Sequence, residues 1–404
     1  MRRLLPILAL AGPLLAAGSI HAQPSPEGAW AVALEAPDGT VVRFVLEVRR
    51  DEDGAWGATA RRTDPERELS IEQWTLADGT IVFSIPELPG APRFSGSVLE
   101  TEIVGEVSLE PPPPPPSTDI YLFELSRGAN GRVVGRSTRV TDRQGYDNQP
   151  SFVPGGGSLL YTSIRGEQAD VYRYDLATGE STALTETAES EYSPTPLPSG
   201  DGFSTVRVEA DGTQRLWSFD LQGRAPVLLL EGIAPVGYHT WIDGHRLGLF
   251  VLGSPPELRL AELGTGRHRQ LGAAIGRSLH PAPQGGAVTF VDKTDDSWTI
   301  ELLEVDSGRR ATLIETLPER EDFAWTPDGT LLMGDGSNLY TAQPFHDDPQ
   351  WRWVADLGSH GVTDISRLAV SDDGSRLALV SARAAAGARE RISRPFRMVR
   401  IADD

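Results

Sequence analysis

The sequence FAWTPDGTLLM at residues 323–333 joins two short apolar segments through a Thr-Pro-Asp-Gly turn. Proline sets φ at the first corner of such a turn, aspartate accepts hydrogen bonds from its own backbone, and glycine adopts positive φ without strain. Similar patterns occur as AVSDDGSRLALV at residues 369–380 and SFVPGGGSLLY at residues 151–161. A pair of strands joined by a tight turn therefore recurs along the chain.

The recurrence is periodic. We mark each copy by the residue just ahead of the centre of its first strand, and successive markers are 44, 45, 40, 44 and 45 residues apart. The markers are Ser151, Thr195, Thr240, His280, Ala324 and Ala369. A repeat of about 40–45 residues is typical of a four-stranded propeller blade. Six markers therefore predict an all-β, six-bladed β-propeller over residues 118–382.

A second motif with alternating apolar and polar residues follows four of the copies, as in DVYRYDL at 170–176 and RLWSFDL at 215–221. It also occurs once before the first marker, as DIYLFEL at 119–125. The array thus begins with outer strands and ends with inner ones. We expect residues 120–125 to complete the last blade, because a closed ring leaves only short sheet edges. A strand-like segment at residues 396–401 is an alternative candidate for that position.

The array resembles the TolB-type propellers of the bacterial periplasm and the wider group of WD-repeat-like propellers. The resemblance rests on FAWTPDG at 323–329, SDDG at 371–374, DIY at 119–121 and DVY at 170–172. It implies the six-bladed fold and a protein or peptide partner in the periplasm. The α/β domain that precedes the TolB propeller is replaced here by a β-rich segment, so membership of the same cell-envelope system is not implied.

The remaining residues divide into four predicted segments. Residues 1–22, with a basic start, an apolar run and a small-residue end, are expected to be a cleavable signal peptide, the alternative being a short membrane anchor. Residues 27–110 predict a small antiparallel β domain of seven strands, curled like a barrel. Residues 111–117 contain six prolines and predict a polyproline linker. Residues 383–404 form an arginine-rich tail, with a flexible arm as one expectation.

The amino-acid composition disfavours or excludes several classes of partner and site. The 404 residues carry a formal charge of −20, which disfavours binding to nucleic acid and to anionic lipid. The chain has no cysteine, so disulfides and thiolate metal sites are excluded. Beyond residue 22 we expect no membrane span, because no later stretch is long and apolar enough. The expected signal peptide at residues 1–22 predicts a periplasmic or secreted protein.

The candidate site follows from the ring geometry. Segments that lead into the innermost strands of a propeller face its central channel, and here they carry carboxylates, tyrosines, a histidine and arginines. The predicted ligand-binding residues are Asp147, Asn148, Glu191, Tyr192, Tyr238, His239, Arg277, Glu321, Asp322, Asp364 and Arg367. We predict no catalytic residues, no metal ligands and no cofactor. A calcium site formed by Asp147, Glu191, His239, Asp322 and Asp364 is an alternative, and a solvated hydrogen-bonded wall is another.

Three functions remain open at this point. The first is a non-catalytic binding or scaffolding protein that recognises a protein or peptide through the propeller face. The second is an enzyme, a metal-assisted hydrolase or lyase at the channel, although no Gly-x-Ser-x-Gly motif or metal-ligand spacing of histidines is present. The third is a sensor that binds a sugar or peptide in the channel mouth. The fold alone does not decide among them.

Overall fold

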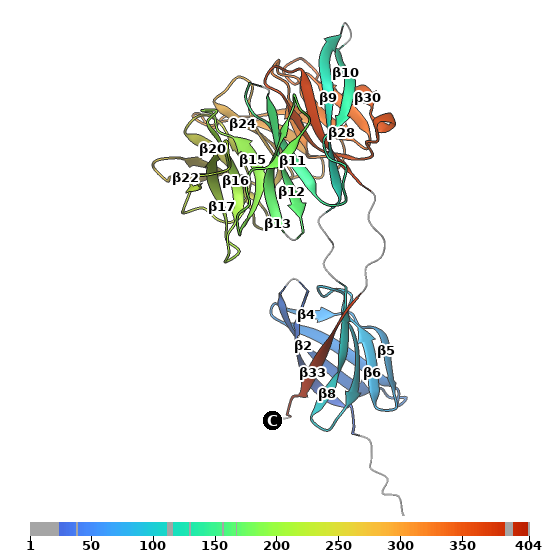
Figure 1. The fold of residues 1–404 in the computed structure, drawn as a ribbon. Coiled ribbons are helices and arrows are strands. Elements are labelled where there is room, and N and C mark those ends of the chain that lie inside the picture. Colours follow the sequence, from blue (N-terminus) through green and yellow to red (C-terminus); the bar gives the residue numbers. More distant parts are fainter. Residues whose placement is uncertain are drawn as a thin grey trace, which may run out of the picture. The chain divides into compact units, whose positions relative to one another are not determined.

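The computed structural model describes residues 24–37, 39–110, 116–128, 131–155, 157–166, 168–383 and 391–402 (Figure 1). The predicted signal peptide, most of the predicted polyproline linker and residues 384–390 of the predicted tail lie outside the described residues. The chain divides into two units. We call residues 24–110 with 391–402 the β domain, and residues 116–383 the propeller.

The β domain is one antiparallel sheet of nine strands. Its order is β4-β3-β2-β1-β33-β8-β7-β6-β5. The strands are β1 (Gly28–Glu35), β2 (Val41–Arg50), β3 (Trp56–Thr63), β4 (Glu66–Leu69), β5 (Glu72–Ala77), β6 (Thr80–Ser84), β7 (Arg93–Val98), β8 (Glu102–Leu109) and β33 (Ile392–Arg400). Burial alternates along β1 and β2, as a strand with one buried face requires. The sheet curls into a half-barrel, which agrees with the predicted barrel-like domain.

The core of the β domain is aromatic. The ring of Phe94 on β7 lies 4.7 Å from Phe83, 5.8 Å from Phe44 and 5.3 Å from Phe396, measured between ring centroids. Strand β7, which carries Phe94, approaches its neighbour β8 closely at Gly105, where an added Cβ would lie 2.0 Å from the carbonyl oxygen of Ser95. Glycine at this position therefore lets β7 and β8 pair in register.

Strand β33 corrects two expectations. It lies between β1 and β8, with eight register pairs from Ile392↔Leu109 to Val399↔Glu102 on one side and Trp30↔Arg400 on the other. The prediction of seven strands in this domain is therefore wrong, and so is the proposal that residues 396–401 are a propeller edge strand or a flexible arm. The reason is hydrophobic: Phe396 and Met398 point into the β-domain core and are buried there.

The described residues of the propeller form six four-stranded antiparallel sheets around a common axis (Figure 1). Five sheets are consecutive in sequence: β11 (Asp147–Phe152), β12 (Ser158–Arg165), β13 (Gln168–Asp175), β14 (Ser181–Ala183); β15 (Ser190–Pro196), β16 (Gly202–Val208), β17 (Gln214–Asp220), β18 (Val227–Leu228); β19 (Val236–Trp241), β20 (Arg246–Val251), β21 (Glu257–Glu262), β22 (His268–Ala273); β23 (Ile275–Pro281), β24 (Ala287–Asp292), β25 (Thr299–Glu304), β26 (Arg310–Glu315); β27 (Phe323–Trp325), β28 (Leu331–Asp335), β29 (Asn338–Ala342), β30 (Arg352–Asp356). A single 3₁₀ turn, η1 (Gly358–His360), follows them.

The sixth sheet closes the ring as predicted. It joins β9 (Thr118–Gly128) and β10 (Gly131–Arg139) to β31 (Ile365–Val370) and β32 (Arg376–Ala382) in the order β10-β9-β32-β31. The register sets Ile120 opposite Val380 and Phe123 opposite Leu377. The six-bladed ring and its closure by residues 120–125 are therefore confirmed.

Within the part of the chain that the structure describes, no helix has the length and hydrophobicity needed to span a bilayer.

Candidate binding site at the propeller channel

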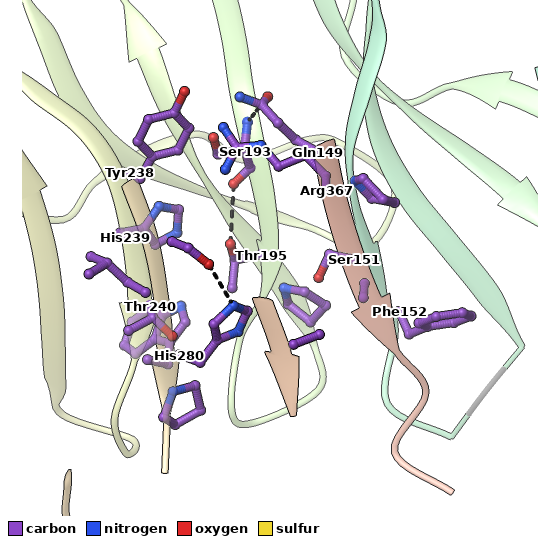
Figure 2. Close-up of a pocket in the computed structure, with 18 of the residues that line it drawn as sticks. Gln149, Ser151, Phe152, Ser193, Thr195, Tyr238, His239, Thr240, His280 and Arg367 are labelled. Atoms are coloured by element: carbon purple, nitrogen blue, oxygen red, sulfur yellow. Dashed lines mark hydrogen bonds between the residues drawn. The ribbon is translucent and has the colours of Figure 1, made fainter. Parts of the chain in front are cut away.

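A cavity of about 480 Å³ lies along the axis of the propeller (Figure 2). Its wall takes residues from the first strand of every blade, namely β11, β15, β19, β23, β27 and β31. All six marker residues of the repeat line it, and so do the six residues two positions before them: Gln149, Ser193, Tyr238, Ser278, Asp322 and Arg367. The sequence period thus becomes rings of side chains around one channel.

The channel mouth is the end at which the innermost strands begin, and we define it by Gln149, Tyr238, Arg277, Asp322 and Arg367. Asp322 bridges two guanidinium groups. Arg277 Nη2 donates to Asp322 Oδ2 at 2.6 Å, and Arg367 Nη1 lies 3.0 Å from Asp322 Oδ1. The guanidinium carbon of Arg367 also lies 4.7 Å from the ring centroid of Tyr238. Both arginines are thereby held in fixed positions at the mouth.

A second carboxylate, that of Glu321, holds Arg277 in place. Glu321 lies 3.5 Å from Arg277 Nε and 2.9 Å from Lys293 Nζ, and it accepts the backbone N–H of Arg277 at 3.0 Å. Although burial alone would raise it, the pKa of Glu321 is lowered by its hydrogen bond to Lys293 and by Arg277. Glu321 therefore remains ionised and orients Arg277.

Two histidines on the channel wall are neutral. Burial lowers the pKa of His239 to about 3 and that of His280 to about 4. His239 Nε2 lies 2.7 Å from Ser204 Oγ, which also accepts a hydrogen bond from Trp241 Nε1 at 2.9 Å. His280 Nε2 lies 3.2 Å from Ser278 Oγ (Figure 2). Ser204 is fully buried, so this serine–histidine pair is not placed to meet a substrate.

The neutral state of His239 predicts a pH dependence of stability. Its folded pKa lies below the unfolded value, so the stabilisation is complete above the unfolded pKa and is lost as pH falls toward the folded pKa. Between pH 7 and pH 5 we expect His239 to lower the free energy of unfolding by about 2 kcal/mol. Urea unfolding at both pH values, compared with His239→Gln, measures this loss. Equal losses in the wild type and the variant would contradict the prediction.

A second cavity of about 380 Å³, the tyrosine groove, adjoins the mouth. It shares Gln149 and Tyr238 with the channel. Its other lining residues are Tyr146, Ile164, Tyr192, Val206, Val208, Gln214, Gly237 and Leu252. Burial raises the pKa of Tyr146 and of Tyr192, so both phenols are protonated at neutral pH. The groove is therefore an uncharged, mostly apolar surface beside two arginines.

The predicted site residues fall into three groups. Five line the channel: Tyr238, His239, Arg277, Asp322 and Arg367. Tyr192 lines the tyrosine groove. The residues that line neither cavity are Asp147, Asn148, Glu191, Glu321 and Asp364, so the expectation that every segment leading into an inner strand faces the channel is wrong for these five.

Hydrogen bonds to the second strands hold Asp147 and Glu191 away from the channel. Each pairs with the residue opposite on the second strand of its blade: Ser163 Oγ donates to Asp147 at 2.6 Å, and Arg207 Nε donates to Glu191 at 3.0 Å. Irregular pairing follows immediately in both strands, at Gln149 with φ of 57° and at Ser193 with φ of 56°. Such a bulge changes the direction of the following side chains.

The other two carboxylates and the amide have separate partners. Asp364 accepts a hydrogen bond from Arg320 Nη1 at 2.8 Å, and Asn148 contacts Thr118 Oγ1 at 3.4 Å. The five proposed calcium ligands therefore do not converge. In the portion of the chain described by the structure, no three His, Asp or Glu side chains are grouped so that they could hold a metal ion.

Several wall residues were not predicted. The repeat period could have identified many of them, because every marker residue lines the channel. Applying the same period to the position two residues earlier would have identified Gln149, Ser193 and Ser278. Two apolar residues of the groove, Ile164 and Val206, lie on β12 and β16, the second strands of their blades. The sequence pattern of these strands is that of any buried strand, so it does not indicate a groove.

Comparison with known proteins shows which solved structures have a similar fold. No protein-family model matches the chain. The uncharacterized protein Atu1656 of Agrobacterium fabrum is 28% identical over 93 residues, a match that spans 23% of this chain and 29% of that protein's length. Among solved structures, a putative TolB from Agrobacterium tumefaciens superposes with a TM-score of 0.53 at 14% identity, covering 67% of this chain and 100% of that chain.

The larger unit has a TolB-like propeller fold. TolB from Acinetobacter baumannii gives a TM-score of 0.44 at 12% identity over 87% of this chain and 82% of that chain. At these identities the likeness concerns the fold. The site of this TolB-like propeller must therefore be judged from its own residues.

Proposed function

We propose that the protein is a secreted, periplasmic binding or scaffolding protein whose TolB-like propeller recognises a protein or peptide through the channel mouth and the tyrosine groove. The observation that carries this proposal is the continuity of the two cavities through Gln149 and Tyr238. An open channel with fixed arginines and an adjoining tyrosine-lined apolar groove has the chemistry of a recognition surface, where tyrosine and arginine contribute most to affinity.

Site-specific photo-crosslinking tests the proposal. A benzophenone amino acid at position 192 would lie in the tyrosine groove, whereas the same group at position 353 lies on outer strand β30, where Trp353 is 60% exposed. In periplasmic extract of the source bacterium we expect a discrete protein adduct from position 192 only. Tyr238→Ala combined with the crosslinker should reduce that adduct at least tenfold. Identical adducts from both positions, or none from position 192, would overturn the proposal.

A further inference from the structure

We propose that the channel mouth binds a peptide carboxylate, with an adjacent apolar side chain of the same peptide in the tyrosine groove. This inference rests on the proposed function and specifies its ligand class. The carboxylate can come from a C-terminus or from an Asp or Glu side chain, and the experiment below distinguishes the two sources.

The first argument is the supply of unused donors. Arg277 uses Nε and Nη2 on Asp322, and Arg367 uses Nη1 on the same carboxylate. Arg277 Nη1 and Arg367 Nη2 have no hydrogen-bond acceptor among the residues that the structure describes. Both arginines line the channel, and both oxygens of Asp322 are already engaged. These donors face the channel, where water or a ligand can accept from them, and a carboxylate is the ligand group that a guanidinium pairs with best.

The second argument is charge. The mouth and its support contain three cations, Arg277, Lys293 and Arg367, and two carboxylates, Glu321 and Asp322. Among these five groups one positive charge is in excess, in a chain whose formal charge is −20. A cleft that carries the sign opposite to the rest of the surface attracts an anionic group specifically.

The third argument separates a peptide from a small anion. Gln149 lies on the boundary of the two cavities, and its Oε1 accepts the backbone N–H of Ser193 at 2.8 Å. This bond leaves the Gln149 amide N–H₂ as a donor for a peptide carbonyl. Beyond it the groove offers Tyr146, Tyr192 and Leu252, the last being 40% exposed. An inorganic anion would leave this apolar surface uncovered, whereas a peptide with an apolar side chain next to its carboxylate covers it.

The experiment uses the full-length protein and two hexapeptide libraries with all positions random, one with a free C-terminal carboxylate and one amidated. Bound peptides are separated by ultrafiltration and sequenced by mass spectrometry. We expect at least tenfold greater recovery of the free-acid library, with Phe, Tyr, Trp, Leu, Ile or Met enriched in its last two positions. Enrichment of Asp or Glu beside an apolar residue in the amidated library assigns the carboxylate to a side chain instead, and also supports the proposal.

Variants then locate the carboxylate. The best-enriched peptide is titrated by calorimetry against the wild type, Arg277→Gln and Arg367→Gln. Each substitution leaves Asp322 paired with the other arginine, so both variants are expected to fold, which circular dichroism verifies. We expect affinity to fall about tenfold or more in each. Arg259→Gln is the matched control: Arg259 pairs with Glu257 on outer strand β21, and affinity should not change.

Equal recovery of both libraries without acidic enrichment, or unchanged affinity in both channel variants, would overturn the carboxylate proposal. Failure of every library peptide to bind the wild type would overturn it as well. In each of these cases the crosslink at position 192 still decides the proposed function separately, because it detects any partner in the groove whatever its charge.

Discussion

Removing residues 391–404 is expected to unfold the β domain and leave the propeller folded. The deletion takes away β33, which lies in the interior of the nine-stranded sheet, together with the buried Phe396 and Met398. Loss of a buried Phe and a buried Met costs about 3–5 and 2–5 kcal/mol when each is truncated alone. The combined loss is comparable with the entire stability of a small domain, about 5–15 kcal/mol.

The ends of β33 add to this expected loss. Arg391 donates to the carbonyl oxygens of Ala91 and Ser108 at 2.6 and 2.7 Å. Near the other end, Arg400 donates to Glu100 O at 3.0 Å, and its guanidinium carbon lies 4.3 Å from the Trp30 ring. The strand is therefore fixed to the sheet at both ends as well as along its length.

Hydrogen exchange measured by mass spectrometry tests the deletion. Amides of β1 and β8 should lose their protection, whereas those of β20 and β28 in the propeller should keep it. Val399→Ala is the control, because Val399 lies on the same strand but is 49% exposed, and its effect should be small. A synthetic peptide of residues 391–402 should restore protection when added to the truncated protein. Unchanged exchange in β1 and β8 after the deletion would show that the sheet does not depend on β33.

Phe123→Ala is expected to destabilise the propeller by about 3–5 kcal/mol. Phe123 lies on β9, is 0% exposed, pairs in register with Leu377, and packs edge-on against His360 at 5.3 Å between ring centroids. It thus belongs to the sheet in which the first strands of the array meet the last. A cavity at this position weakens the closure of the ring itself, and not only one blade.

The matched control is Phe345→Ala. Phe345 is 48% exposed and stacks on Trp325 with ring centroids 5.8 Å apart, so its removal should cost less than about 1 kcal/mol. Urea unfolding of both variants, followed by near-ultraviolet circular dichroism, gives the two free-energy differences. If Phe123→Ala changed stability as little as Phe345→Ala, ring closure through β9 would contribute little to the stability of the propeller.

The propeller could be predicted because its determinants are local and repeated. The Pro-Asp-Gly turn at residues 327–329 and its copies define the repeat period, and the number of copies gives the number of blades. Closure also followed, because outer-strand motifs precede the first marker. By contrast, β33 alternates apolar and polar residues like any half-buried strand. Its partner β8 lies far away in sequence, with Arg391 bonded to Ser108 across a separation of 283 residues, and alternation alone does not specify which sheet a strand joins.

The site was predictable to the extent that it follows the period. Asp322 and Arg367 lie two positions before their markers and Arg277 lies three before its marker, and the structure brings the three together. Asp147 and Glu191 lie four positions before their markers, two residues further away than Asp322 and Arg367. The positions equivalent to Asp322 and Arg367 in the first two consecutive blades are Gln149 and Ser193, and both line the channel. The carboxylates two residues earlier bond to second strands instead, and these long-range partners are not visible in the local sequence.

The interior position of β33 also has a consequence for biosynthesis. Translation proceeds from the first residue to the last, so β1 through β8 leave the ribosome long before the strand that completes their sheet. During that interval the backbone edges of β1 and β8 that pair with β33 have no partner strand. The sheet cannot be completed until the rest of the polypeptide has been made. Folding of the β domain is thereby tied to completion of the chain, and a prematurely terminated product would expose its unfinished sheet to quality-control proteases.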